Sequence, residues 1–264
     1  MSDFMTAAAI VAAGVWVYMT TWFVVAIVER RDDVVDTAWG LGFAAIAAFF
    51  AARTEGSRTL LVAFIVAFWG IRLALHINRR NRRRGEDFRY VELRRRWRRF
   101  FVLRTYIQVF MLQGAFMVVI SLPVIAVGAS SPSELSVLDF LGITVAVAGV
   151  FIEATADAQL ERFRRRRVRK TKFLQQGLWA WSRHPNYFGE TLVWWGLWLV
   201  SLSTPYGPWA ILGPLAITFL LTKVTGIPML ERKYEGDPEF ESYKARVNAF
   251  VPMRPKRTEG PTEP

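Results

Sequence analysis

The chain has 264 residues, of which 53% are hydrophobic, and its 34 Lys and Arg residues against 22 Asp and Glu residues give a net charge of +12. High apolar content combined with strong basicity is typical of a membrane protein, which separates the two kinds of residue by depth in the bilayer. The sequence has no cysteine, which excludes disulfides and Cys-ligated metals. His76 and His184 are its only histidines, too few for a multi-His cluster, so we expect no metal.

Seven apolar stretches predict seven transmembrane helices, because a spanning helix needs roughly 20 mostly apolar residues. The stretches are 5–28, 36–52, 59–77, 106–129, 137–157, 188–203 and 207–224, of which the second and sixth are short. The predicted fold class is therefore all-α, a polytopic integral membrane protein. We expect one membrane domain over residues 1–252 and a disordered tail over 253–264, which is rich in Pro, Glu and Thr.

The distribution of positive charge predicts the orientation in the membrane. With seven spans, 31 of the 34 basic residues fall on one side, Arg53 and Arg58 fall on the other, and Arg72 lies within the third span. Basic loops stay in the cytoplasm, so we expect the N-terminus outside and the C-terminus inside.

Two loops, 78–105 and 158–172, carry most of the arginines. Such runs usually lie against anionic lipid head groups, with Trp97, Phe100 and Phe101 as interfacial anchors here. A phosphate-bearing cofactor is an alternative partner, since arginine binds phosphate in a bidentate manner. We expect no nucleic-acid partner, because the clusters lie within a few residues of span ends.

Ionisable residues inside spans are costly and usually face a cavity or a partner. Four predicted helices carry such residues near their cytoplasmic ends, several of them spaced three or four residues apart on one face. They are Asp36; Arg72, His76 and Arg79; Glu153, Asp157 and Glu161; and Asn186 with Glu190. We expect these groups to converge on one cavity that opens to the cytoplasm. Mutual ion pairing that only holds the helices together is the alternative.

The segment before the sixth span, residues 177–190, is the most specific in the chain. Pro185 suits the first turn of a helix, and free amides at a helix N-terminus beside Arg183 and His184 form a possible anion site. By contrast, the Gly-x-Gly-x-x-Ala run at 40–45 has no preceding strand, so small-residue helix packing explains it better than nucleotide binding.

The run from Ser182 to Glu190, Ser-Arg-His-Pro-Asn-Tyr-Phe-Gly-Glu, resembles the C-terminal signature of the steroid 5α-reductase superfamily, in particular its bacterial steroid-5α-reductase-like members. Further matches lie at 72–90, at 153–160 and at 230–252, so that the resemblance covers most of residues 36–252. The last third is also similar to isoprenylcysteine carboxyl methyltransferases.

The resemblance implies an oxidoreductase that uses NADPH to reduce a carbon–carbon double bond conjugated to a carbonyl, in a lipophilic substrate such as a steroid, isoprenoid or lipid. It implies a multi-pass protein of the bacterial cytoplasmic membrane, with its active site facing the cytoplasm. The residues implied to bind the cofactor, with neighbouring basic groups added, are Arg79, Asp87, Arg89, Tyr90, Glu153, Asp157, Arg164, Lys172, Arg183, His184, Asn186, Tyr187, Glu190 and Tyr234.

Hydride transfer to the β-carbon builds negative charge on the carbonyl oxygen, where an acid is needed. The family has a Gln-Glu pair in the second span and a Tyr in the third for this carbonyl, whereas this sequence has Asp36 with Trp39, and His76. We expect a protonated His76 paired with Asp36 to be the acid, and Trp39 and Arg72 to contact the substrate. A buried structural His76 is the alternative.

Three other functions remain open from the sequence. An S-adenosylmethionine-dependent methyltransferase would give fewer roles to residues 78–90. A lipid-binding or small transport protein would bind no nucleotide. A haem held by His76 and His184 would give a Soret band.

Overall fold

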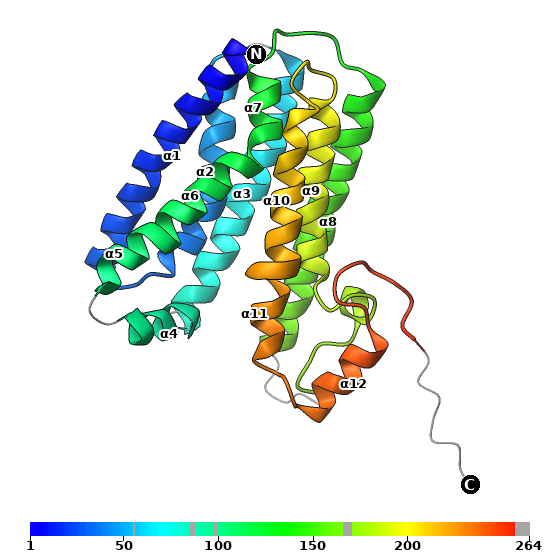
Figure 1. Cartoon of the computed structure of the whole chain (residues 1–264). Helices are drawn as coiled ribbons and strands as arrows, with labels where there is room; N and C mark the ends of the chain where they lie inside the picture. The colour runs from blue at the N-terminus through cyan, green and yellow to red at the C-terminus, as the bar shows by residue number, and fades with distance from the viewer. Residues whose placement is uncertain (55, 85–87, 98–99, 166–170, 257–264) are drawn as a thin grey trace. The chain divides into compact units, whose positions relative to one another are not determined.

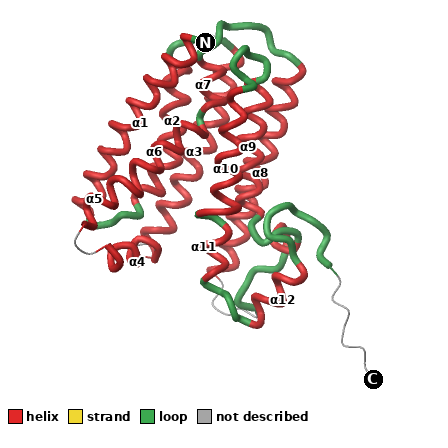
Figure 2. Tube along the Cα trace, in the orientation of Figure 1, coloured by secondary structure: helices red, strands yellow, loops and turns green. Residues whose placement is uncertain are grey.

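The computed structural model describes residues 1–54, 56–84, 88–97, 100–165 and 171–256, and for residues 83, 84, 88, 89 and 96 it describes the backbone alone. Every regular element within these residues is helical (Figure 2). In chain order the α-helices are α1 (Ser2–Glu29), α2 (Val34–Ala51), α3 (Ser57–Arg84), α4 (Phe88–Trp97), α5 (Phe101–Thr105), α6 (Leu112–Ile120), α7 (Leu122–Gly128), α8 (Val137–Arg165), α9 (Pro185–Ser201), α10 (Leu212–Phe219), α11 (Ile227–Arg232) and α12 (Pro238–Arg246) (Figure 1). Short π-helical and 3₁₀ segments join some of them: η2 (Tyr106–Met111), η3 (Gly177–Ala180), η4 (Trp209–Ile211) and η5 (Leu220–Val224).

Six helices among the described residues are long and apolar enough to cross a membrane: Ser2–Glu29, Val34–Ala51, Ser57–Arg82, Phe101–Ile120, Val137–Arg165 and Trp209–Arg232. In the apolar 18-residue stretch of each of these helices, between 22% and 44% is buried inside the protein. Large apolar side chains such as Phe64 (71% exposed) and Phe151 (68%) therefore point outward, as expected of helices that a bilayer surrounds. The protein is an all-helical, polytopic membrane protein, as the sequence predicts.

The predicted fourth span, 106–129, differs from the observed helix. The spanning helix begins at Phe101 and ends at Ile120, where Ser121 separates α6 from α7. Pro123 explains the break, since proline has no N–H for the helical ladder but fits the first turn of a new helix, as it does in α7.

The predicted sixth span, 188–203, corresponds to α9, which has 17 residues. It begins three residues earlier than predicted, at Pro185, which takes the first helical position. At this length α9 lies at the lower limit for a spanning helix.

The chain divides into two compact units, and each is described by itself. Unit 1 comprises Met1–Ile143 and Leu197–Ala216. Its core contains the fully buried side chains of Phe43, Trp69, Phe110 and Met117. In this unit α2 packs closely on α3, where a Cβ added to Gly40 would collide with the carbonyl oxygen of Gly70. Small-residue helix packing at Gly40 is thereby confirmed.

Unit 2 comprises Thr144–Gly196 and Ile217–Pro264. Here α8 and α9 approach at Gly149 and Gly189, where a Cβ on Gly189 would lie 2.7 Å from the Gly149 carbonyl oxygen. A second, small core of Phe240, Tyr243 and Val247 packs on Phe173 beside α12.

Candidate functional site

The end of the α8–α9 pair in unit 2 collects four polar residues, which we call the α8–α9 polar cluster: Glu153 and Asp157 from α8, and Asn186 and Glu190 from α9. Each pair is spaced one helical turn apart and so shares a face. The cluster depends on Gly189, because a Cβ there would lie 2.6 Å from the backbone nitrogen of Glu153. The three carboxylates are buried, with exposed fractions of 2% for Glu153 and 7% for Asp157 and Glu190.

Asn186 joins the two helices of this cluster. Its Nδ2 donates a hydrogen bond to Oδ1 of Asp157 at 3.3 Å. Its Oδ1 is buried and has no hydrogen-bond partner among the described residues. A buried polar atom without a partner costs free energy, roughly 1–3 kcal/mol, and is often completed by a ligand or water. The α8–α9 polar cluster can therefore accept a hydrogen bond from a bound molecule.

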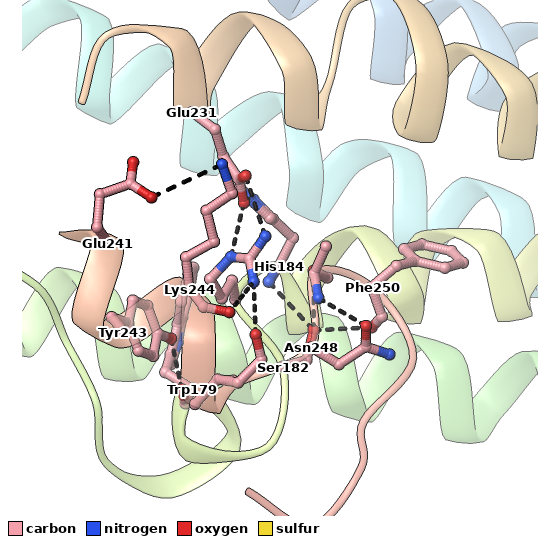
Figure 3. A network of polar contacts seen from close by, with 12 residues as sticks. Trp179, Ser182, His184, Glu231, Glu241, Tyr243, Lys244, Asn248 and Phe250 are labelled. Carbon is pink, nitrogen blue, oxygen red and sulfur yellow. Dashed lines mark hydrogen bonds and ion pairs between the residues drawn. The ribbon is translucent and has the colours of Figure 1, made fainter. Parts of the chain in front are cut away.

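The two residues immediately before α9, Arg183 and His184, belong to a charged network centred on Glu231 of α11 (Figure 3). Arg183 donates from Nε to Oε1 of Glu231 at 2.8 Å and from Nη2 to Oε2 at 3.0 Å. Nε2 of His184 lies 3.0 Å from the same Oε1. The side chains of Arg183 and His184 are at most one-tenth exposed. The Glu231 carboxylate therefore fixes the position of these two residues, which precede Pro185.

The turn before α9 also binds residues 247–253, a segment that follows α12 and that we call the C-terminal strap. The backbone nitrogen of Arg183 donates to the carbonyl of Asn248 at 2.9 Å, and Nη1 of Arg183 donates to the carbonyl of Val247. The Ser182 hydroxyl donates to the Phe250 carbonyl at 2.7 Å (Figure 3). The strap is therefore held by backbone and side-chain bonds to the turn that leads into α9.

Arg183 and His184, both predicted to bind the cofactor, thus make extensive contacts within the chain. Nε, Nη1 and Nη2 of Arg183 all donate to protein acceptors. The His184 ring stacks on Tyr187, with ring centroids 5.5 Å apart and an interplanar angle of 6°. Glu231 was not among the predicted site residues. Its signal in the sequence is that it is the first acid after a long apolar run, but nothing there indicates Arg183 as its partner.

Two other predicted cofactor residues, Tyr234 and Lys172, contact residues in or next to the small core and α12. Tyr234 packs edge-on against Phe173, with ring centroids 5.0 Å apart. Nζ of Lys172 donates to Oδ2 of Asp237 at 2.8 Å, and this hydrogen bond raises the pKa of Lys172 and lowers that of Asp237. Burial raises the pKa of the Tyr243 phenol, so this group stays a neutral hydrogen-bond donor.

In unit 1 the structure joins Asp36 to Tyr90. The Tyr90 hydroxyl donates to Oδ1 of Asp36 at 2.8 Å, and Nη2 of Arg80 lies 3.9 Å from Oδ2. Tyr90, which is predicted to bind the cofactor, is only 5% exposed. Sequence reasoning missed Arg80, although it follows the predicted Arg79.

The remaining predicted residues are placed as follows. Trp39 packs edge-on against Phe43, with ring centroids 5.0 Å apart. On α3, Arg72 and His76 are partly buried and Arg79 is exposed; on α8, Arg164 is partly buried. Asp87 and the side chain of Arg89 lie outside the described residues.

Comparison with known proteins places the chain in a family. The model of the DUF1295 family, described as proteins of unknown function, matches residues 22–247. An uncharacterised protein of Schizosaccharomyces pombe is 24% identical over 253 residues, which cover 85% of this chain and 72% of the yeast protein. No solved structure matches. Since the family model spans most of the sequence, including α2–α3, the α8–α9 polar cluster and Glu231, the chain belongs to the DUF1295 family.

Proposed function

We propose that this protein is an NADPH-dependent oxidoreductase, which reduces a carbon–carbon double bond conjugated to a carbonyl in a lipophilic substrate. The proposal joins the motif resemblance at Arg72–Tyr90, Glu153–Leu160 and Ser182–Glu190 to the chemistry of the residues at those positions. A membrane-embedded protein with large apolar side chains facing outward suits a substrate that arrives through the bilayer.

The observation that carries the proposal is the α8–α9 polar cluster. Three buried carboxylates and an asparagine with an unpaired buried Oδ1 occur side by side on two apolar helices. Burial of so many polar groups at membrane-helix positions is costly, which favours a functional reason for keeping them. Ribose hydroxyls and the nicotinamide carboxamide can donate hydrogen bonds. The carboxylates and Oδ1 of Asn186 can accept them. The residues of this cluster therefore fit the ribose and nicotinamide parts of a dinucleotide.

Bound NADPH would supply the hydride, and the chain would supply binding and an acid for the carbonyl oxygen. We assign the acid role to a protonated His76, with Asp36 as its predicted partner. Tyr90 is a second candidate for this role, because its hydroxyl lies 2.8 Å from Asp36 in a buried position. Either donor would stabilise the negative charge that develops on the carbonyl oxygen.

NADPH titration of the purified full-length protein tests the proposal. We expect saturable binding in the wild type and weaker binding in Asn186→Ala, because the variant removes both the unpaired acceptor and the bond to Asp157. Asn248→Ala is the matched control, since this side chain is exposed and its hydrogen bonds to described residues lie within the C-terminal strap. Wild-type protein that binds no NADPH, or that binds S-adenosylmethionine instead, contradicts the reductase.

We further propose a seven-span topology, in which α9 is the additional short span and the candidate site faces the cytoplasm. The distribution of charge supports it, since these seven spans leave only Arg53 and Arg58 on the outer side. The N-terminus is then outside and the C-terminus cytoplasmic.

A further inference from the structure

The segment between α3 and α5 is strongly basic, and some of its described arginines are exposed. Residues 79–104 contain twelve arginines and three acidic residues. Among the described side chains, Arg80 and Arg94 form ion pairs with Asp36 and Asp32. Arg82, Arg95 and Arg104 are exposed.

The inner face of α4 is fixed to unit 1 at two points one helical turn apart. Tyr90 donates to Asp36, and Nη2 of Arg94 donates to Oδ2 of Asp32 at 2.6 Å. The Arg94 guanidinium also lies 5.4 Å from the ring centroid of Phe101, the first residue of α5. These contacts define which face of α4 is inside, because residues i and i+4 share a face.

The other face of α4 and the start of α5 are exposed and combine charge with apolar surface. Glu92 and Arg95 are exposed on α4. Phe100, Val102 and Leu103 follow, each more than half exposed, at 57%, 58% and 57%. Arginines beside exposed apolar side chains are the composition that binds the boundary between lipid head groups and acyl chains.

The position of α4 in the chain decides what partner this surface meets. It connects two candidate spanning helices, Ser57–Arg82 and Phe101–Ile120, so the chain leaves and re-enters the membrane on the same side within this segment. Within unit 1, α4 runs crosswise to α3 and close to α5 (Figure 1). A helix that connects two spanning helices in this way is well placed to meet the membrane surface.

We propose that α4 and the start of α5 form an interfacial binding surface for anionic phospholipid head groups, with Phe100, Val102 and Leu103 inserted among the acyl chains. Arg95 and Arg104 bind lipid phosphates, while Tyr90 and Arg94 hold the helix to unit 1. The lipid contact does not depend on nucleotide binding, so its test does not depend on whether the protein is a reductase.

A single spin label on the exposed face of α4 tests this proposal, and the absence of cysteine makes the labelling specific. We use Glu92→Cys in the full-length protein, reconstituted in nanodiscs of phosphatidylcholine with or without phosphatidylglycerol. When phosphatidylglycerol is present, we expect the label to lie deeper in the bilayer. The measurement is a rise in the ratio of its collision rate with oxygen to its collision rate with a water-soluble nickel complex. High salt reverses this shift, because surface charge is screened.

Two controls make the result specific. Ser131→Cys, on an exposed loop far along the chain, shows no such shift. In the Glu92→Cys background, Arg95→Glu with Arg104→Glu abolishes it, whereas Arg162→Glu with Arg254→Glu, an equal change of charge at exposed arginines elsewhere, preserves it. Equal collision ratios in both lipids overturn the proposal, as does an equal effect of soluble heparin in phosphatidylcholine discs, which would identify a soluble polyanion as the partner.

Discussion

At the scale of single residues, Arg58 and Asp139 form a buried ion pair in unit 1. Nε and Nη2 of Arg58 donate to the two carboxylate oxygens of Asp139 at 2.8 and 2.9 Å. Asp139 is fully buried and Arg58 is 6% exposed. Arg58 also donates to the Ser133 hydroxyl, and Asp139 accepts from the Ser136 backbone nitrogen at 2.6 Å. The pair thus ties the start of α8 and the loop before it to α3.

Asp139→Asn is expected to lower the stability of the protein by about 3–5 kcal/mol, because it leaves the Arg58 charge buried without its counter-ion. The measurement is thermal or denaturant unfolding in detergent. Replacing both partners, as Arg58→Met with Asp139→Leu, is expected to cost less than the single change. A double variant that is less stable than Asp139→Asn contradicts this explanation.

Tyr90→Phe tests whether the hydroxyl of Tyr90 does more than hold α4. Loss of one hydrogen bond to Asp36 is expected to cost roughly 0.5–1.5 kcal/mol of stability. If Tyr90 serves as the acid of the proposed reductase, turnover falls by about 10²–10⁴-fold at unchanged NADPH affinity. Normal turnover in a folded Tyr90→Phe variant leaves the acid role to His76 paired with Asp36.

At the scale of helices, the packing of α8 on α9 depends on Gly149 and Gly189. A Cβ on Gly189 would lie 2.6 Å from the backbone nitrogen of Glu153 and 2.7 Å from the carbonyl oxygen of Gly149. Backbone atoms of a helix cannot move aside cheaply. The two glycines therefore set the helix spacing that brings Glu153 near Asn186 and Glu190.

Gly189→Ala is accordingly expected to destabilise the protein by about 1–3 kcal/mol through overpacking, and to weaken NADPH binding. Gly14→Ala in α1 is the matched control, since an added Cβ there has open space within 4 Å. A helical Gly-to-Ala change in open space is expected to be neutral or to stabilise by roughly 0.5–1 kcal/mol. Equal thermal stabilities of the two variants would show that the α8–α9 contact can relax.

The α12 helix is expected to loosen in acid. Asp237 caps its N-terminus, accepting from the backbone nitrogens of Glu239 and Phe240, and bonds to Lys172. The bond to Lys172, helped by these backbone bonds, lowers the pKa of Asp237. A lowered folded-state pKa contributes stability above the ordinary carboxyl pKa, and this is lost as the pH falls through the folded value.

Hydrogen exchange measured along α12 against pH checks this expectation. Protection of residues 238–246 should fall at acidic pH in the wild type, whereas Asp237→Asn should show weaker protection that changes less with pH. Lys172→Met should shift the wild-type transition toward higher pH, because the group that lowers the Asp237 pKa is removed.

At the scale of the whole molecule, the proposed seven spans put the two termini on opposite sides of the membrane. Single cysteines at Ser2 and Arg254, in a chain without natural cysteine, are expected to react with an impermeant maleimide from opposite sides of intact vesicles. Ser131→Cys should react from the same side as Ser2→Cys. Labelling of both termini from one side would mean that α9 does not span.

The amino-acid sequence alone was enough to predict the membrane class, the all-helical fold and most spans. Hydropathy and charge are summed over about 20 neighbouring residues, so α1, α2, α3 and α8 were predicted to within a few residues at their starts. Even the break after Ile120 has a local cause in Pro123.

The contacts within the candidate site were decided by tertiary structure. Glu231 pairs with Arg183 across 48 residues, and the Tyr90 hydroxyl reaches Asp36 across 54. The sequence pattern identified Asp36, Arg183 and His184 as special but did not indicate Tyr90 or Glu231 as their partners. Spacing along a helix determines which side chains share a face, whereas the partner of a buried charge depends on which distant helix packs against that face. Only the folded chain settles that choice.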